Sequence, residues 1–117
     1  KRLELEEKKR RELAESISGI GIKVEADEET DFVRVSYVKL GLPAQKAFPS
    51  LFIGDLITSI DGKSTKGMTV NEALKLIKGP PGTQVTLSIK RTYEFAHPPI
   101  FTNTYTRVLF HPNKRYY

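Results

Sequence analysis

The chain has 117 residues, which is enough for a single domain with a small hydrophobic core. No apolar run approaches the roughly 20 residues that a membrane-spanning helix needs, and the absence of cysteine excludes disulfides and thiol chemistry. The net charge of +5 arises from 19 basic and 14 acidic side chains that form no single block. Neither a membrane span in this fragment nor nucleic-acid binding is therefore expected.

The first 15 residues are mostly charged. Acidic side chains precede basic ones by four positions, as in Glu4 and Lys8 or Glu6 and Arg10, which is the favourable order on a helix. We expect a charged helix over residues 1–15 that packs lightly or connects the domain to a neighbouring one. Because the chain begins inside this charged run and without methionine, we expect it to be a fragment of a longer protein.

Two glycines alternate with two isoleucines in the segment Gly19-Ile20-Gly21-Ile22. Glycine reaches backbone angles that other residues avoid, and it leaves no side chain in the way. A loop of this kind can direct successive N–H groups into one concavity that suits a carboxylate. It can equally be a tight turn before a strand, and the segment alone does not decide between these interpretations.

Alternating apolar and polar residues after the glycines predict a series of strands. Turns are expected at the acidic loop 26–31 and at the Asp-Gly pair 61–62. The expected elements are strands over 20–24, 32–38 and 56–60, helices over 43–48 and 70–78, a strand over 85–89, a loop over 91–103 and a last strand over 105–110. Together they predict an α+β domain, a partly open β-barrel of five or six strands with two core helices.

The second of these helices has the clearest signals. Thr69 and Glu72 have the spacing of a capping box at its start, and Gly79 with the following prolines is expected to stop it. Its apolar residues cover an arc of roughly 160°, and they are Val70, Ala73, Leu74, Leu76 and Ile77. This arc is wider than one core contact requires, so one edge can pack on the core while the other faces a groove. Plain core packing remains the alternative.

No pattern of catalytic or cofactor-binding residues is present in the sequence. His97 and His111 each precede proline, and neither has a nucleophile at a recognisable spacing. The segment 79–83 lacks the lysine of a phosphate-binding loop, and the pair Gly19 and Gly21 lacks the third glycine of a dinucleotide site. We therefore expect no catalytic residue, no metal and no cofactor within these residues.

The order of these elements resembles that of a PDZ domain. The similar segments cover roughly residues 18–110 and are Gly19-Ile20-Gly21-Ile22, Leu42-Pro43-Ala44, Gly54-Asp55-Leu56-Ile57, Ile60-Asp61-Gly62 and Ala73-Leu74-Lys75-Leu76-Ile77. A strand near the end of the chain, over 106–110, in place of one before the glycine loop is similar to the permuted PDZ domains of carboxyl-terminal processing serine proteases. The segment 48–53 and the loop 91–103 are longer than is usual in that family.

The resemblance implies a site for the end of another polypeptide, which pairs as an extra strand. The terminal carboxylate would bind the N–H groups of the glycine loop, and an apolar last side chain would lie among Ile20, Ile22 and Ile77. The third residue from the peptide's end would face Val70 and Leu74 and should be apolar too. The expected peptide-binding residues are Gly19, Ile20, Gly21, Ile22, Lys23, Val24, Val70, Leu74 and Ile77.

The resemblance also implies an organisation and a function. Residues 1–15 are expected to be a connector, residues 16–112 the PDZ domain and residues 113–117 a tail. The domain would recognise partner proteins with apolar C-termini for a carboxyl-terminal processing protease, whose neighbouring protease domain would hold the catalytic serine and lysine. In a bacterial protease of this kind the location would be the periplasm or cell envelope. The alternative is an interaction module in a scaffold or secretion component that is not an enzyme.

Overall fold

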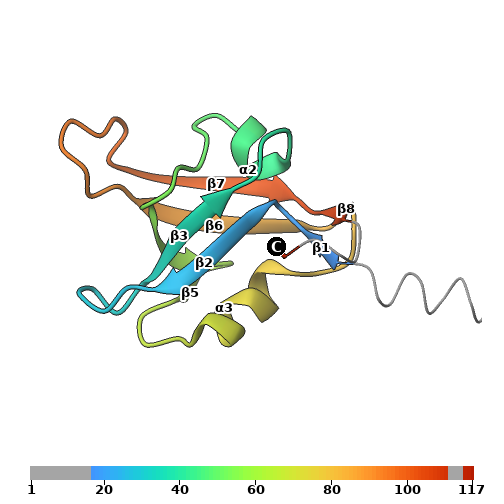
Figure 1. Cartoon of the computed structure of the whole chain (residues 1–117), viewed down its shortest axis with the longest axis horizontal. Coiled ribbons are helices and arrows are strands. Elements are labelled where there is room, and N and C mark those ends of the chain that lie inside the picture. Colours follow the sequence, from blue (N-terminus) through green and yellow to red (C-terminus); the bar gives the residue numbers. More distant parts are fainter. Residues whose placement is uncertain (1–16, 111–114) are drawn as a thin grey trace, which may run out of the picture.

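The computed structural model describes residues 17–110 and 115–117, so the helix expected over residues 1–15 lies outside the described residues. The described part contains eight strands and two helices (Figure 1). In chain order they are β1 (Ile17–Gly19), β2 (Ile22–Ala26), β3 (Val33–Val38), α2 (Pro43–Lys46), β4 (Leu56–Ile60), β5 (Lys63–Ser64), α3 (Val70–Ile77), β6 (Gln84–Lys90), β7 (Ile100–Thr106) and β8 (Val108–Phe110). None of the helices in these ranges has the length and apolar character needed to cross a membrane.

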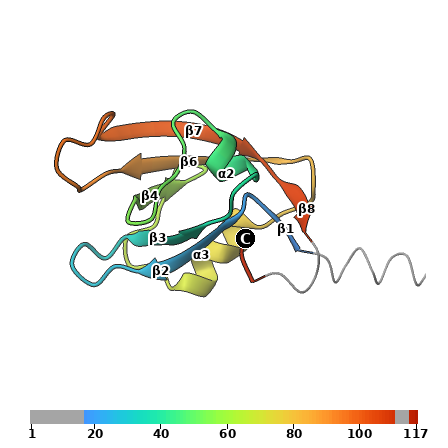
Figure 2. The same ribbon diagram turned by 45° about the horizontal axis from the view of Figure 1, so that its top comes forward.

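Most of the strands form one antiparallel sheet in the order β2-β3-β4-β6-β7, and the short β5 pairs with β4. The strands β1 and β8 form a separate ribbon, in which Ile17 lies opposite Phe110 and Gly19 lies opposite Val108. The last strand thus pairs beside the glycine loop, as the permuted order requires. Because the sheet stays open, with α3 beside β2 and α2 near β7, the expected partly open barrel with two helices is confirmed (Figures 1 and 2).

The segment 91–103 is shorter as a loop than expected, because β7 already begins at Ile100. The strand β7 pairs with β6, from Thr106 opposite Gln84 to Ile100 opposite Lys90. The outer face of this hairpin is polar, and hydroxyl groups meet across it, as in Thr86 and Thr104 at 2.8 Å. Such a threonine-rich face lacks the strong apolar alternation on which the strand prediction depends. The expected last strand is also divided in two, between β7 and β8.

The end of α2 and the start of β2 also differ from the sequence prediction. The helix α2 ends at Lys46 rather than at Phe48, since the residue before Pro49 is disfavoured in a helical conformation. The strand β2 begins at Ile22 rather than at Ile20, because Gly21 has a positive φ of 94° that interrupts the strand. The helix α2 is thus two residues shorter than expected, whereas β2 keeps its length and lies two residues further along the chain, from Ile22 to Ala26.

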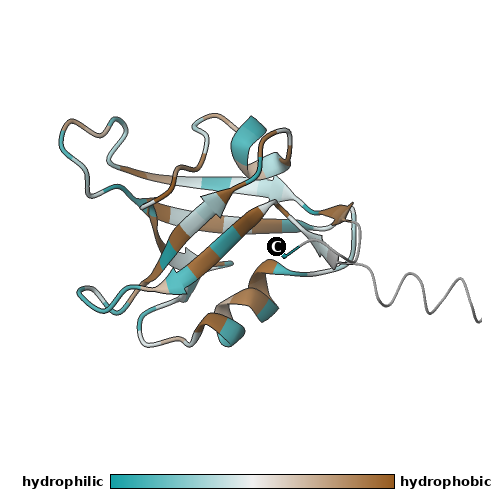
Figure 3. Ribbon diagram, in the orientation of Figure 1, coloured by the Kyte–Doolittle hydropathy of each residue, from teal (hydrophilic) through white to brown (hydrophobic). Residues whose placement is uncertain are grey.

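The core lies between the sheet and the two helices. Alternation of apolar and polar residues along β2 and β6 turns one face of each strand inward (Figure 3). The largest fully buried side chains come from the strands, apart from Ile20, Leu51 and Ile77. They include Tyr105, and burial raises the pKa of its hydroxyl to about 12. From α3, Ala73 and Ile77 are fully buried, whereas Val70 and Leu74 are only half-buried at the edge of the core.

The C-terminal end of α3 is fixed by a buried arginine rather than by a left-handed glycine. Lys78 is the C-cap and Gly79 has no positive φ. The guanidinium of Arg107 donates to the carbonyl oxygens of Ile77 at 2.9 Å and Leu76 at 3.0 Å, which would otherwise lack partners at the helix end. A Cβ at Gly79 would lie 2.7 Å from Cζ of Arg107, so a larger residue there would push the guanidinium away from these carbonyl oxygens.

A buried ion pair joins β4 to the β6–β7 hairpin. Asp55 is fully buried and Arg91 is 6% exposed. The Nε of Arg91 donates to both carboxylate oxygens of Asp55, at 3.2 and 3.3 Å, and the Phe52 N–H donates to the same carboxylate at 2.9 Å. Arg91 also donates to the carbonyl oxygen of Ser50, and its guanidinium stacks 4.7 Å from the Phe52 ring centroid. The pair therefore anchors the long segment before β4.

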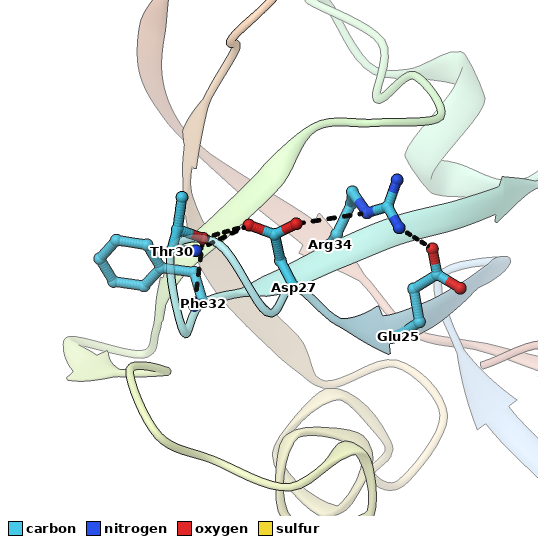
Figure 4. A network of polar contacts seen from close by, with 5 residues as sticks. All are labelled: Glu25, Asp27, Thr30, Phe32 and Arg34. Carbon is cyan, nitrogen blue, oxygen red and sulfur yellow. Dashed lines mark hydrogen bonds and ion pairs between the residues drawn. The ribbon is translucent and has the colours of Figure 1, made fainter.

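The tip of the β2–β3 hairpin carries a more exposed polar network (Figure 4). Asp27 accepts hydrogen bonds from the N–H and hydroxyl groups of Thr30, and its other oxygen lies 3.8 Å from Nε of Arg34. Arg34 also pairs with Glu25, and these two side chains are 41% and 49% exposed. This network closes the acidic loop expected over 26–31 and keeps β2 in register with β3.

Candidate functional site

The glycine loop between β1 and β2 directs three successive N–H groups toward one oxygen atom. The N–H groups of Ile20, Gly21 and Ile22 lie 3.1, 2.9 and 3.0 Å from the main-chain oxygen of Tyr117. Tyr117 is the last of the 117 residues, and it comes back to this loop between β2 and α3 (Figures 1 and 2). The predicted concavity therefore exists, and a segment of the same chain occupies it.

The loop is held in this conformation by its own carbonyl groups and by its glycines. The carbonyl oxygen of Ile20 accepts from the Ala44 N–H and that of Gly21 accepts from the Lys39 N–H, each at 2.9 Å. Gly21 has a positive φ of 94°, and a Cβ on it would lie 2.6 Å from Cβ of Leu42. With the carbonyls bonded to the fold, the N–H groups face the opposite side, where they donate to Tyr117.

Tyr117 pairs with β2 as an added strand does. Besides the bond from the Ile22 N–H to Tyr117, the Tyr117 N–H donates to the carbonyl oxygen of Ile22 at 2.6 Å. Two residues that exchange both main-chain bonds form the hydrogen-bonded pair of an antiparallel ladder. This pairing is possible because β2 lies at the edge of the sheet, where its outer N–H and C=O groups have no neighbouring strand of the sheet.

Gly19 makes room for the main chain that docks on the loop. A Cβ on Gly19 would lie only 2.4 Å from the carbonyl carbon of Tyr117 and 3.1 Å from its Cα. Gly19 has no positive φ, so its backbone conformation does not itself demand glycine. The absence of a side chain at Gly19 lets the docked segment approach the loop closely, whereas Gly21 is needed for the positive φ of the loop itself.

We use the name β2–α3 site for this loop, the outer edge of β2 and the adjoining side of α3. The structure brings together all the residues expected to bind peptide in this site. Ile20, Ile22 and Ile77 are fully buried, Val24 is 9% exposed, and Lys23 is exposed. Val70 and Leu74 are half-buried and pack against the same apolar cluster as Tyr117.

Sequence reasoning missed several residues around Tyr117. Lys78, at the end of α3, places its Nζ 4.5 Å from the centroid of the Tyr117 ring. The neighbouring Tyr116 packs edge-on against Phe110 and lies near Tyr37. Only the basic and aromatic composition of the tail hinted at these contacts, since no pattern in the sequence links positions so far apart.

A second hollow lies away from this site, beside the 91–99 loop. It has a volume of about 560 Å³ and is lined mainly by apolar side chains, together with Ser50, Arg91 and His97. Phe48 and Phe52 belong to its wall. None of the residues expected to bind peptide lines this hollow, so binding there and binding at the β2–α3 site would affect different residues.

The sequence of this chain matches one protein family and several curated proteins. The model of the PDZ domain family matches residues 8–90. The carboxy-terminal processing protease CtpA of Bacillus subtilis is 43% identical over 79 residues, which are 68% of this chain and 16% of that protein. The carboxy-terminal-processing protease of Bartonella bacilliformis is 39% identical over 71 residues, which are 61% of this chain and 16% of that protein. The chain thus spans about a sixth of the length of these relatives.

Solved structures show the same likeness. One is the PDZ domain of a carboxy-terminal protease from Vibrio cholerae in complex with peptide, with a TM-score of 0.67 and 25% identity, over 81% of this chain and 97% of that one. Another is a photosystem II D1 C-terminal processing protease, with a TM-score of 0.69 and 29% identity, over 84% of this chain and 24% of that one.

Proposed function

Because this chain belongs to the PDZ domain family, we propose that its β2–α3 site captures the C-terminal end of a partner polypeptide as an extra strand on β2. The observation that carries the proposal is the convergence of three N–H groups on one oxygen, together with the return bond from the docked N–H to Ile22. In this structure the main-chain oxygen of Tyr117 occupies the position proposed for a carboxylate oxygen of the partner, and Tyr117 occupies the position of the partner's last residue.

The loop favours a carboxylate over a neutral group at this position. Hydrogen bonds to a charged partner contribute about 1.5–3 kcal/mol each, against about 0.5–1.5 kcal/mol for neutral pairs. The three donors act together, and they are set in place before the ligand arrives because the fold already bonds the loop's carbonyl groups. Recognition of the chain end therefore comes from the backbone and tolerates many peptide sequences.

Side chains of α3 and β2 then restrict which peptides fit. In the proposed complex the last side chain packs beside Ile20, Ile22 and Ile77, and burial of an apolar group there contributes about 1.5–3 kcal/mol. The third residue from the end faces Val70 and Leu74, which offer no hydrogen-bond donor. Both positions of the peptide should accordingly be apolar.

The wider role that we propose is substrate recognition in a longer protein. The curated relatives are carboxy-terminal processing proteases of which this chain matches only about 16%. In such a parent protein this domain would hold the C-terminal end of a protein substrate, and a serine protease domain outside these residues would cleave it. The catalytic groups would then lie beyond the sequence described.

In the 117-residue chain, a partner peptide has to displace residues 115–117 before it can bind. The apparent affinity is therefore lower than the intrinsic affinity by the fraction of molecules in which the site is open. The ratio of affinities between two peptides is independent of this fraction, since both displace the same segment. Comparisons between matched peptides are for this reason the informative measurements.

The first prediction concerns the carboxylate itself. A peptide with three apolar residues at its end is titrated into the 117-residue chain, once as the free acid and once as the C-terminal amide, by isothermal calorimetry. We expect the amide to bind at least about tenfold more weakly, which corresponds to about 1.4 kcal/mol. A peptide with the same residues in reverse order controls for composition. Equal affinities of acid and amide would refute carboxylate capture.

A further inference from the structure

The proposal in this section rests on the peptide-binding function and adds the class of ligand. We infer that the β2–α3 site selects peptides that end in two aromatic residues, and that Lys78 recognises the last of them through a cation–π contact with its ring. The main-chain bonds to the glycine loop are the same for any residue, so they carry no such selectivity. The side-chain contacts of the segment that occupies the site carry it.

Lys78 provides a cation above the ring of the last residue. Its Nζ lies 4.5 Å from the ring centroid of Tyr117, within the distance of about 6 Å at which a cation–π interaction forms. The backbone of Lys78 is fixed as the C-cap of α3, with its N–H 2.9 Å from the carbonyl oxygen of Leu74. An aliphatic side chain at the peptide's end would pack on the same apolar wall, but it would present no π face to this cation.

Two rings provide a surface for the penultimate side chain. The centroid of the Tyr116 ring lies 4.9 Å from that of Phe110, at an interplanar angle of 71°, and 6.2 Å from that of Tyr37. Both distances lie in the range of about 4.5–7 Å that is typical of aromatic pairs. Phe110 is buried at the end of β8 and Tyr37 is on β3, where Lys23 lies over its ring at 5.2 Å. A small penultimate residue would reach neither ring.

The three contacts come from separate parts of the fold. Lys78 follows α3, Tyr37 belongs to β3 and Phe110 belongs to β8. They surround the position where the peptide would end, so the aromatic preference concerns the last two residues and not those further along β2. Among peptides with apolar C-terminal residues, the site should therefore prefer those whose last two residues are aromatic.

The test compares two peptides, identical except for a last residue of tyrosine or leucine, both as free acids and both with penultimate tyrosine. In the unaltered chain we expect the tyrosine peptide to bind about two- to fivefold more tightly, the range for an exposed cation–π contact. Lys78→Met keeps the length of the side chain and removes the charge, so it should abolish this ratio. Lys75→Met, on the exposed side of the same helix, is the matched control and should preserve it.

A third peptide with penultimate alanine and terminal tyrosine tests the second half of the proposal. We expect it to bind about two- to tenfold more weakly than the peptide that ends in two tyrosines. A ratio of one between tyrosine and leucine, or a ratio that Lys78→Met leaves unchanged, would overturn the role of Lys78. Equal affinity of the alanine peptide would overturn the aromatic penultimate position. In these cases the free acids still bind, so peptide capture stands. Failure of every free acid to bind would overturn both proposals.

Discussion

Replacing Asp55 by alanine is expected to lower the free energy of unfolding by about 3–5 kcal/mol. The substitution leaves the Arg91 guanidinium, 6% exposed, without its carboxylate and leaves the Phe52 N–H without its acceptor. Removing one partner of a buried ion pair leaves the other charge buried without a partner and without water. The loss of stability therefore exceeds the net contribution of the pair. Because small domains are stable by only about 5–15 kcal/mol, this variant should be close to unfolding at 37 °C.

Chemical denaturation of both chains measures this difference. Arg34→Ala is the control, because it breaks an ion pair with Glu25 in which the two side chains are 41% and 49% exposed, together with a longer contact of 3.8 Å to Asp27. Exposed pairs of this kind contribute at most about 1 kcal/mol each. Asp55→Asn is a milder variant that keeps an oxygen for the Phe52 N–H. Burial raises the pKa of the Asp55 carboxyl, and the Phe52 N–H and the Arg91 guanidinium oppose that rise. A loss for Asp55→Ala no larger than for Arg34→Ala would show that the buried pair does not anchor β4.

Gly19→Ala is expected to weaken peptide binding at least about tenfold without unfolding the domain, when the altered and unaltered chains both end after residue 114 so that residues 115–117 no longer compete for the site. The added Cβ would lie 2.4 Å from the carbonyl carbon of the docked residue, a separation that forces the ligand away from the loop. The three N–H bonds to its terminal oxygen then cannot all form, and the loss of one charge-assisted bond alone costs about 1.5–3 kcal/mol. Since Gly19 has no positive φ, alanine introduces no backbone strain at this position.

Titration of a free-acid peptide, together with a thermal unfolding curve of each variant, checks this result. Ser18→Ala changes the adjacent residue, whose buried hydroxyl has no hydrogen-bond partner in the described part of the chain, and it should leave peptide affinity unchanged. Gly21→Ala is expected to behave differently, because its φ of 94° and its contact with Leu42 make alanine destabilising to the loop itself. A folded Gly19→Ala chain with full affinity would contradict the proposed path of the peptide backbone.

The features that the sequence predicted well are those with strong local signals. The start of α3 follows from Thr69, whose side chain accepts from the Glu72 N–H at 3.1 Å. Of its apolar arc, Ala73 and Ile77 are buried in the core, whereas Val70 and Leu74 are half-buried at its edge. The glycine loop follows from the two glycines, although each is needed for a different reason. The permuted pairing of β8 with β1 followed from the family resemblance, since periodicity alone does not specify which strands pair.

The features that were missed depend on contacts between distant residues. The outward face of β7 carries three threonines, Thr102, Thr104 and Thr106, so this strand resembles a loop until it is seen to pair with β6. Gly79 resembles a helix stop, and only the position of Arg107 reveals that it accommodates a guanidinium. Lys78 lies on the polar side of its helix, and its proposed role arises only from the position of Tyr117.

The amide resonances of Ile20, Gly21 and Ile22 test the central proposal most directly. A nitrogen-labelled chain is titrated with a free-acid peptide and followed by amide correlation spectra. The account predicts that these three resonances shift together, with saturation at one common affinity, as the peptide replaces residues 115–117 at the glycine loop. If they stay in place while the largest changes occur around Phe52 and His97, at the second hollow, the peptide binds elsewhere and the proposed site is wrong.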